Sequence, residues 1–309
     1  MKRKIIILTV ILITACSGGA FFSYKMYGKY RELTKEQTLL KIRKDKWENL
    51  KKAIEHKVVN FRGTAGIVVE DLDSEWEIAF NKDTLIPAAS LVKIPIMLSC
   101  FYAAQDGKIS LEDTASLKNS QRVSGSRALG DVPSGSVFTV KELLKPMITQ
   151  SDNTAANLLI DLVGFDALNG YFKKMGLKST NLARKMMDFK ERSEGEENYT
   201  TAQDMALLLE RMYHNDLLNK DVSEECLQLL GQQKINDRIP RKLPKNGTFI
   251  AHKTGLERHV CHDVGIVYTD KGNFLICVLA KHEDRFARSA KRFISDIALL
   301  TYNYYQNPD

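Results

Sequence analysis

Proline and glycine are scarce in this chain, with 7 prolines and 18 glycines among 309 residues, and no repeat or low-complexity tract is visible. Disordered chains are commonly rich in such residues and tracts, so this composition argues against disorder. Hydrophobic residues make up 44% and charged residues 27% of the chain, as is ordinary for a globular protein. A chain of this length can bury a substantial core, as one large domain or as two lobes.

Motifs for disulfide frameworks, metal sites and nucleic-acid binding are also absent. His259 and His262 fit neither the H-E-x-x-H nor the zinc-knuckle spacing, so we predict no metal site and no cofactor. The net charge of +7 comes from scattered lysines without interleaved aromatics, which argues against a nucleic-acid groove. Four cysteines without C-x-x-C spacing are expected to be buried free thiols, with a disulfide left open: Cys100, Cys226, Cys261 and Cys277.

The N-terminus is the exceptional part of the chain. Three basic residues at 2–4 precede an uncharged run over residues 5–24, which is typical of a signal sequence or a membrane span. Residues 13–16 resemble a bacterial lipobox ending at Cys16, but apolar and aromatic residues continue beyond it. We therefore leave open a lipid anchor and a single-span anchor, and both place the remainder outside the cytoplasm at the bacterial cell membrane.

Hydrophobic periodicity predicts the arrangement of the rest. Residues 1–24 are the signal or anchor and 25–36 a linker. The period is helical near 33–58 and through 90–230, and it alternates as in strands at 63–80, 248–255 and 259–281, with a hairpin turn at 270–273 and a last helix at 284–302. Helices and strands at both ends with a helical block between them predict an α/β (α+β) protein. Its antiparallel sheet lobe (37–86 and 233–309) carries flanking helices, and an all-helical lobe (87–232) is inserted into it.

Three short motifs stand at informative places in this arrangement. "PAASLVKIPIML" carries Ser90 and Lys93 one helical turn apart at the start of an apolar helix, where a hydroxyl and an amine can share a proton. Ser151-Asp152-Asn153 lies in the middle of the helical block, and Lys253-Thr254-Gly255 lies on a predicted strand. Each motif alone is close to chance occurrence, but their order and placement together are not.

This set of motifs resembles that of the class A β-lactamases and penicillin-binding proteins. The resemblance runs from about residue 37 to the C-terminus and includes "TVKELLKPMITQSDNTAANLLIDLVG". It implies a β-lactamase/D,D-peptidase-like fold, a monomer, and a serine hydrolase acting on amide bonds. Its small-molecule partner would be a β-lactam or a D-Ala-D-Ala-like compound.

The resemblance also implies roles for individual residues. Ser90 would attack a carbonyl, Lys93, with a pKa lowered by crowding from Lys253, would take its proton, and Ser151 would pass a proton to the leaving nitrogen. Asp152 would hold a loop. The substrate-binding groups would be the side chains of Asn153, Lys253 and Thr254 and the backbone N–H of Leu256, the last forming an oxyanion hole with the N–H of Ser90.

The loop that should supply a second base departs from the family pattern. A hydrolytic class A enzyme carries a water-activating glutamate in a loop that begins with arginine. Arg184 can begin this loop and residues 198–201 resemble its exit, but Lys185, Met186 and Met187 stand where the glutamate belongs. Asp188 is the nearest carboxylate and a candidate water-activating residue. The other acidic residues are predicted to form an acidic surface: Glu191, Glu194, Glu196 and Glu197.

The segment after Lys253-Thr254-Gly255 departs as well. It offers no clear counterpart of the basic residue that supports carboxylate binding, for which Arg258 is a candidate, and His262 and Asp263 are predicted to make structural hydrogen bonds. We therefore predict an exported serine hydrolase that forms an acyl-enzyme with β-lactams and hydrolyses it slowly. The alternatives are a cell-wall D,D-peptidase or related amidase or esterase, and a non-hydrolytic penicillin-binding sensor.

Overall fold

The computed structural model describes residues 32 and 35–306, so the predicted anchor at 1–24 and most of the predicted linker lie outside the described residues. Contacts divide the chain into one unit that ends at Lys51 and includes residues 307–309, and a second from Lys52 to Gln306. A helix over residues 35–59 agrees with the helix predicted at 33–58. None of the helices in the described ranges is both long enough and apolar enough to cross a bilayer.

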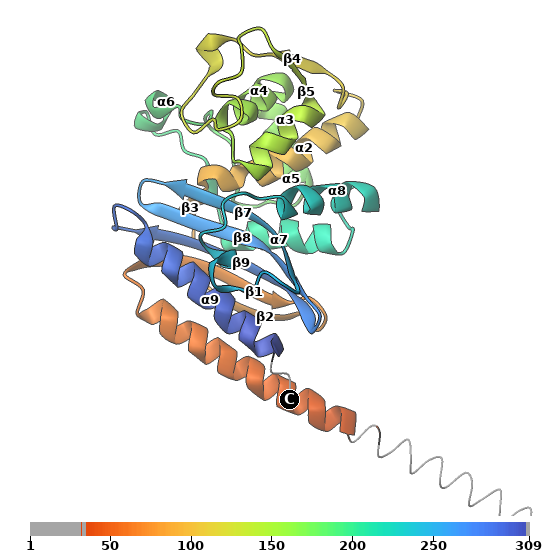
Figure 1. The fold of residues 1–309 in the computed structure, drawn as a ribbon, viewed down its shortest axis with the longest axis vertical. Coiled ribbons are helices and arrows are strands. Elements are labelled where there is room, and N and C mark those ends of the chain that lie inside the picture. Colours follow the sequence, from red (N-terminus) through yellow and green to blue (C-terminus); the bar gives the residue numbers. More distant parts are fainter. Residues whose placement is uncertain (1–31, 33–34, 307–309) are drawn as a thin grey trace, which may run out of the picture. The chain divides into compact units, whose positions relative to one another are not determined.

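A five-stranded antiparallel sheet forms one half of the second unit (Figure 1). Its spatial order is β2-β1-β9-β8-β7, so the pairing of β1 with β9 joins the first two strands to the last three. The predicted sheet built from both ends of the chain is therefore confirmed. The strands are β1 (Gly63–Asp71), β2 (Trp76–Phe80), β7 (Thr248–Glu257), β8 (Val260–Thr269) and β9 (Gly272–His282).

The C-terminal helix α9 (Arg288–Gln306) begins later than the predicted residue 284. The Asp284 carboxylate accepts hydrogen bonds from the backbone N–H groups of Phe286 and Ser289, and Ala287 has a positive φ of 53°. The chain therefore makes a turn before the helix begins, because a left-handed residue interrupts helical geometry. In Figure 1, α9 lies in front of the sheet and α7 (Ala202–Tyr213) lies behind it, and both helices contact sheet strands.

The inserted lobe centres on α2 (Lys93–Gln105), in which every residue from Lys93 to Ala103 is buried. This explains the apolar character of the segment, because a helix that is hydrophobic all round is surrounded by protein. The four cysteines are buried free thiols. The other helices of the lobe are α3 (Val140–Thr149), α4 (Asn153–Val163), α5 (Phe165–Lys174), α6 (Phe189–Ser193) and α8 (Lys220–Gly231).

The prediction of an all-helical lobe is wrong in two details. Strands β4 (Thr114–Ser116) and β5 (Val137–Thr139) pair as a ribbon, and β3 (Ile86–Pro87) pairs with β6 (Tyr199–Thr200). Two or three residues are too few to show an alternating period, so sequence periodicity misses such strands. The β3–β6 pair matters for function because β3 leads directly into Ser90.

Candidate active site

Ser90 lies on a single 3₁₀ turn, η1 (Ala89–Val92), and Lys93 is the first residue of α2. A 3₁₀ turn eclipses residues three apart, and Lys93 Nζ donates a hydrogen bond of 3.2 Å to Ser90 Oγ. The preceding Ala89 has a positive φ of 46°, a strained conformation for alanine. The expected pairing of the two side chains is present, on a tighter turn than the predicted α-helix.

Lys93 is fully buried among polar atoms. Its Nζ also donates to Ser151 O at 2.7 Å, to Ser151 Oγ at 3.3 Å and to Asn153 Oδ1 at 2.7 Å. Burial lowers the pKa of Lys93 to about 7, against the opposing effect of the negative charge of Asp152. Burial is therefore the main cause, rather than the crowding by Lys253 expected from the sequence. At neutral pH a large fraction of Lys93 is an uncharged amine that can accept a proton.

A second buried lysine, on the sheet, also binds the Ser151 hydroxyl. Lys253, on β7, is 0% exposed, and its Nζ donates to Ser151 Oγ at 2.9 Å and to Thr254 O at 2.8 Å. Burial lowers the pKa of Lys253 well below its usual value, and the positive charges of Lys93 and Arg238 lower it further. Ser151, whose hydroxyl binds the side-chain nitrogens of both lysines, has a positive φ of 59°, a strained backbone conformation for serine.

Asp152 and Asn153 hold the loop that crosses this cluster. The buried Asp152 carboxylate caps α4 through Ala155 N at 2.9 Å and accepts from Ala128 N at 2.8 Å and Leu129 N at 3.0 Å. Asn153 Nδ2 donates to Ser124 O at 2.8 Å, while its oxygen faces Lys93. Asp152 thus takes the loop-holding position that the sequence predicts.

The third motif brings β7 close to the turn before Ser90. A Cβ on Gly255 would lie 3.3 Å from Ala88 O and 3.0 Å from the His262 ring, so glycine permits this approach. His262 Nδ1 accepts from Ala280 N at 3.1 Å, so Nε2 carries the proton that is donated to Pro87 O at 2.9 Å. Burial lowers the pKa of His262 to about 4, so the ring is a neutral structural link.

Thr254 is buried beside Lys253, whereas the Leu256 side chain is 50% exposed just beyond Gly255. The structure therefore joins five of the predicted residues in one hydrogen-bonded cluster: Ser90, Lys93, Ser151, Asn153 and Lys253. Thr254 and Leu256 lie on β7, the same strand as Lys253. Their binding roles, including the proposed oxyanion contact of the Leu256 N–H, stay predictions.

Sequence reasoning missed Arg238, a buried cation outside the three motifs that acts on the pKa of Lys253. Arg238 is 1% exposed, its Nε donates to Cys261 Sγ at 3.1 Å, and its charge helps to lower the pKa of Lys253. Cys261 pairs with Leu256 in the β7–β8 register. Arg258, the predicted stand-in for a carboxylate-binding base, is exposed and donates to His259 Nε2. No motif surrounds Arg238, and only the folded sheet brings it to this position.

A buried network of ion pairs closes the loop between Arg184 and Asn198. Arg184, 2% exposed, contacts Glu197 Oε1 at 2.7 Å and Glu257 Oε1 at 3.2 Å, and Arg192 contacts the second oxygen of each glutamate at 3.0 and 3.1 Å. The prediction that Glu197 belongs to an acidic surface is wrong, because only 8% of it is exposed. The network fixes the loop to the end of β7.

In the middle of this loop, the backbone of Met186 is bound by a side chain of α4. The Asn157 side chain binds Met186 N at 2.8 Å and Met186 O at 3.0 Å, and the Met186 side chain is buried. Asp188 accepts from Glu191 N at 3.2 Å and caps α6. Within the described part of the chain, the side-chain hydrogen-bond partners of Lys93 are serine and asparagine, with no carboxylate. The structure does not bring Asp188 into the lysine–serine cluster, and its water-activating role stays a prediction.

The described residues hold no cluster of three or more side chains from His, Cys, Asp and Glu arranged to bind a metal. The reactive groups of the lysine–serine cluster are hydroxyls and amines. Ser90 is a nucleophile whose hydroxyl contacts the buried Lys93 amine, and the Ser151 hydroxyl lies between the side-chain nitrogens of Lys93 and Lys253. This arrangement is suited to acyl transfer, because a proton can leave one hydroxyl and be supplied by the other.

Comparison with known proteins gives a consistent family. The model of the Beta-lactamase enzyme family matches residues 49–305. Beta-lactamase VEB-1 from Pseudomonas aeruginosa is 24% identical over 274 residues, covering 84% of this chain and 91% of the relative. The structure of a beta-lactamase from Sphaerobacter thermophilus is similar with a TM-score of 0.76 and 29% identity, covering 84% of this chain and 98% of that chain. A PBP-A mutant in acyl-enzyme complex with penicillin G matches with a TM-score of 0.76 and 28% identity, covering 84% and 97%.

The buried ion-pair network yields a prediction for stability. Arg184→Ala leaves the carboxylates of Glu197 and Glu257 with Arg192 as their remaining cation, so the free energy of unfolding should fall by about 1.5 to 3 kcal/mol. Urea unfolding measures this change. Lys190→Ala is the control, because Lys190 is 80% exposed and its loss should cost within about 0.5 kcal/mol. Equal effects of the two substitutions would contradict a structural role of the network.

Proposed function

The chain belongs to the beta-lactamase enzyme family, and from that membership we propose an exported serine hydrolase that opens β-lactam rings through an acyl-enzyme on Ser90 and releases the product slowly. The observation that carries the proposal is the contact of Ser90 Oγ with a buried lysine whose pKa is about 7. The names of the relatives support β-lactams as substrates, since they include beta-lactamases and an acyl-enzyme complex with penicillin G.

Acylation uses groups that already touch one another. Neutral Lys93 accepts the Ser90 hydroxyl proton while Oγ forms a bond to the carbonyl carbon of the lactam. The C–N bond then breaks, and the nitrogen takes a proton from Ser151. The protonated Lys93 replaces that proton through its hydrogen bond to Ser151 Oγ, so both side chains return to their starting protonation states. The backbone N–H groups of Ser90 and Leu256 would stabilise the oxyanion, at about 3 to 4 kcal/mol per donor in comparable sites.

The carboxylate end of the substrate would meet Thr254 and Lys253. Arg238 adds a second buried positive charge behind this strand, so the local potential favours an anion even when one of the two site lysines is neutral. Penicillins and D-Ala-D-Ala peptides both carry such a carboxylate. This binding surface is therefore compatible with either class of substrate.

Slow deacylation is proposed because, among the described residues, no carboxylate forms a hydrogen bond with Lys93 or Ser90. From the sequence we place the family's water-activating position at residues 185–187, and the nearby Asp188 carboxylate caps α6 through Glu191 N. A D,D-peptidase or a related amidase or esterase is the second candidate function, because Lys93 has no carboxylate partner among the described residues. A non-hydrolytic sensor is less well supported, since the complete set of acylating residues is retained.

The experiment that tests the proposal is a stopped-flow reaction with a chromogenic cephalosporin, followed by intact-mass measurement and peptide mapping. We expect one stoichiometric burst, an adduct on Ser90, and slow turnover, because losing general-base assistance commonly costs about 10²- to 10⁴-fold in rate. Ser90→Ala is the matched control and should give neither burst nor adduct. Sustained turnover at hundreds of cycles per second would refute slow deacylation, and Asp188→Asn would then show whether Asp188 is the base.

The lowered pKa of Lys93 predicts the pH dependence of acylation. Below pH 7 Lys93 is protonated and cannot accept a proton, so the rate constant should rise with pH and reach half of its plateau near pH 7. Single-turnover acylation measured from pH 5 to 8.5 gives this profile. Lys93→Arg stays charged throughout, and its acylation should be slower by roughly 10³-fold or more. A flat wild-type profile would exclude Lys93 as the proton acceptor.

Membrane display is the remaining part of the proposal. The basic start, the uncharged run and the candidate lipobox support an anchor outside the described residues. Fractionation of wild-type and Cys16→Ala cells should recover the protein with membranes. Loss of lipid labelling in Cys16→Ala would identify a lipid anchor, whereas unchanged membrane recovery without any lipid labelling would identify a span. Recovery of active protein from the cytosol alone would contradict both.

A further inference from the structure

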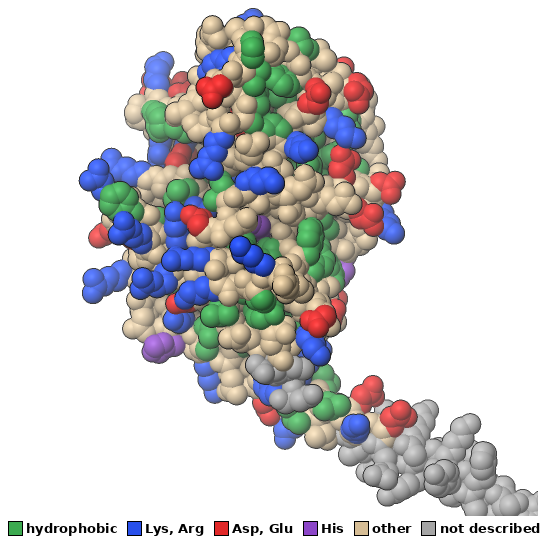
Figure 2. All heavy atoms as spheres, viewed as in Figure 1, with side chains coloured by type: hydrophobic (Ala, Val, Ile, Leu, Met, Phe, Trp, Pro, Cys, Tyr) green, Lys and Arg blue, Asp and Glu red, His purple; other side chains and the backbone are tan. Residues whose placement is uncertain are grey.

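A group of unpaired cations lies at the end of the sheet where α9 begins. Figure 2 shows Lys and Arg side chains gathered on this side of the molecule around exposed hydrophobic atoms. We call it the basic patch, and it consists of Arg62, Lys281, Arg285, Phe286, Arg288 and Arg292. All six are exposed, and among the described residues none of the five cations forms an ion pair. This sets them apart from the cations of the buried loop network.

The fold brings these residues together from distant parts of the chain. Gly63 pairs with His282 across β1 and β9, which places Arg62 beside the strand end that carries Lys281. Arg285 belongs to the turn that follows, and Arg288 and Arg292 are one helical turn apart on α9. The Asp284 hydrogen bonds fix the turn, so the patch has a defined shape.

Phe286 projects from the middle of the patch. It is 61% exposed, and the guanidinium carbons of Arg285 and Arg288 lie 5.5 and 5.2 Å from the centre of its ring. Leaving a phenylalanine in water forgoes the free energy that its burial would supply. An aromatic side chain surrounded by guanidinium groups is matched to an environment that is apolar inside and anionic at its surface.

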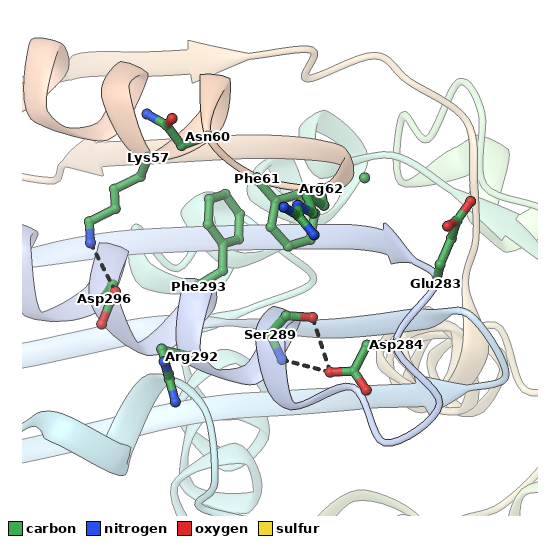
Figure 3. Close-up of a pocket in the computed structure, with 11 residues that line it drawn as sticks. Lys57, Asn60, Phe61, Arg62, Glu283, Asp284, Ser289, Arg292, Phe293 and Asp296 are labelled. Carbon is green, nitrogen blue, oxygen red and sulfur yellow. Dashed lines mark hydrogen bonds and ion pairs between the residues drawn. The ribbon is translucent and has the colours of Figure 1, made fainter.

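A hollow of about 890 Å³ adjoins the patch (Figure 3). Phe61 and Phe293 stack in it at 4.3 Å between ring centres, and Arg62 and Arg292 line it. Of the three carboxylates in its lining, Asp296 is engaged by Lys57 at 3.0 Å and Asp284 by Ser289, whereas Glu283 is exposed at the rim near Lys281 in the chain. The hollow therefore offers an apolar floor and guanidinium groups on its lining.

We propose that the basic patch docks the protein on an anionic phospholipid surface. The five unpaired cations complement negative headgroups, and Phe286 would enter the interface between headgroups and acyl chains. A soluble polyanion would satisfy the cations but would leave Phe286 in water, which favours the lipid. The proposal does not depend on the hydrolase chemistry at Ser90.

The experiment uses the full chain in vesicles of phosphatidylcholine, with or without one third phosphatidylglycerol, and measures hydrogen–deuterium exchange. Peptides covering residues 281–292 should exchange at least threefold more slowly in the anionic vesicles at low salt, and this protection should disappear in 1 M NaCl, where the Debye length is about 3 Å. The proposal is overturned if the peptides exchange equally on both kinds of vesicle.

Three variants separate the contributions. R285E/R288E should lose the protection, since each cation near an anionic surface contributes about fivefold in affinity. K173E/K178E makes the same charge change at exposed lysines of the inserted lobe and should keep it. Phe286→Ser should weaken protection on vesicles. Equal loss of protection in both double variants would show that the patch is not a lipid-docking surface. The same conclusion follows if soluble polyphosphate protects as well as lipid does and Phe286→Ser has no effect.

Discussion

Two buried lysine side chains bind one serine hydroxyl in this protein, and the residues around them reduce the free-energy cost of burying both. Lys93 and Lys253 are both fully buried and both bind Ser151 Oγ. Burying two like charges is costly unless they are hydrogen-bonded or one of them gives up its proton. Asn153 and the carbonyl oxygens of Ser151 and Thr254 supply the acceptors, and the lowered pKa values supply the second route.

Chemistry-bearing motifs and the layered fold could be predicted from the sequence, because both depend on local patterns. Ser90 and Lys93 are three residues apart, and strands such as β8 and β9 show their alternation directly. Arg238 could not be predicted in this way, since its contact with Cys261 exists only after η3 (Ile239–Lys242) packs beside the sheet. Glu197 was misjudged for a similar reason, because its partners Arg184 and Arg192 lie across a loop.

Charged residues have two distinct uses in this chain. In the loop network, two arginines and two glutamates pair with one another around the buried Arg184, so their charges fix the geometry of the loop rather than attract a partner. In the basic patch the cations remain exposed and unpaired among the described residues, so their charge is available to a surface outside the protein. Composition alone does not distinguish the arginines of the two sets, whereas burial and pairing do.

The pairing of β1 with β9 has a consequence for how the protein is made. Gly63 pairs with His282, and nearly all of the second unit lies between them in the chain. Such long-range pairing slows folding, because the loop between the partners must be closed before any contact rewards it. A growing chain can assemble the helices around α2 long before β7 to β9 exist. Lys253 therefore joins Lys93 only when synthesis is nearly finished, and a nascent or truncated chain would hold Ser90 without its complete set of partners.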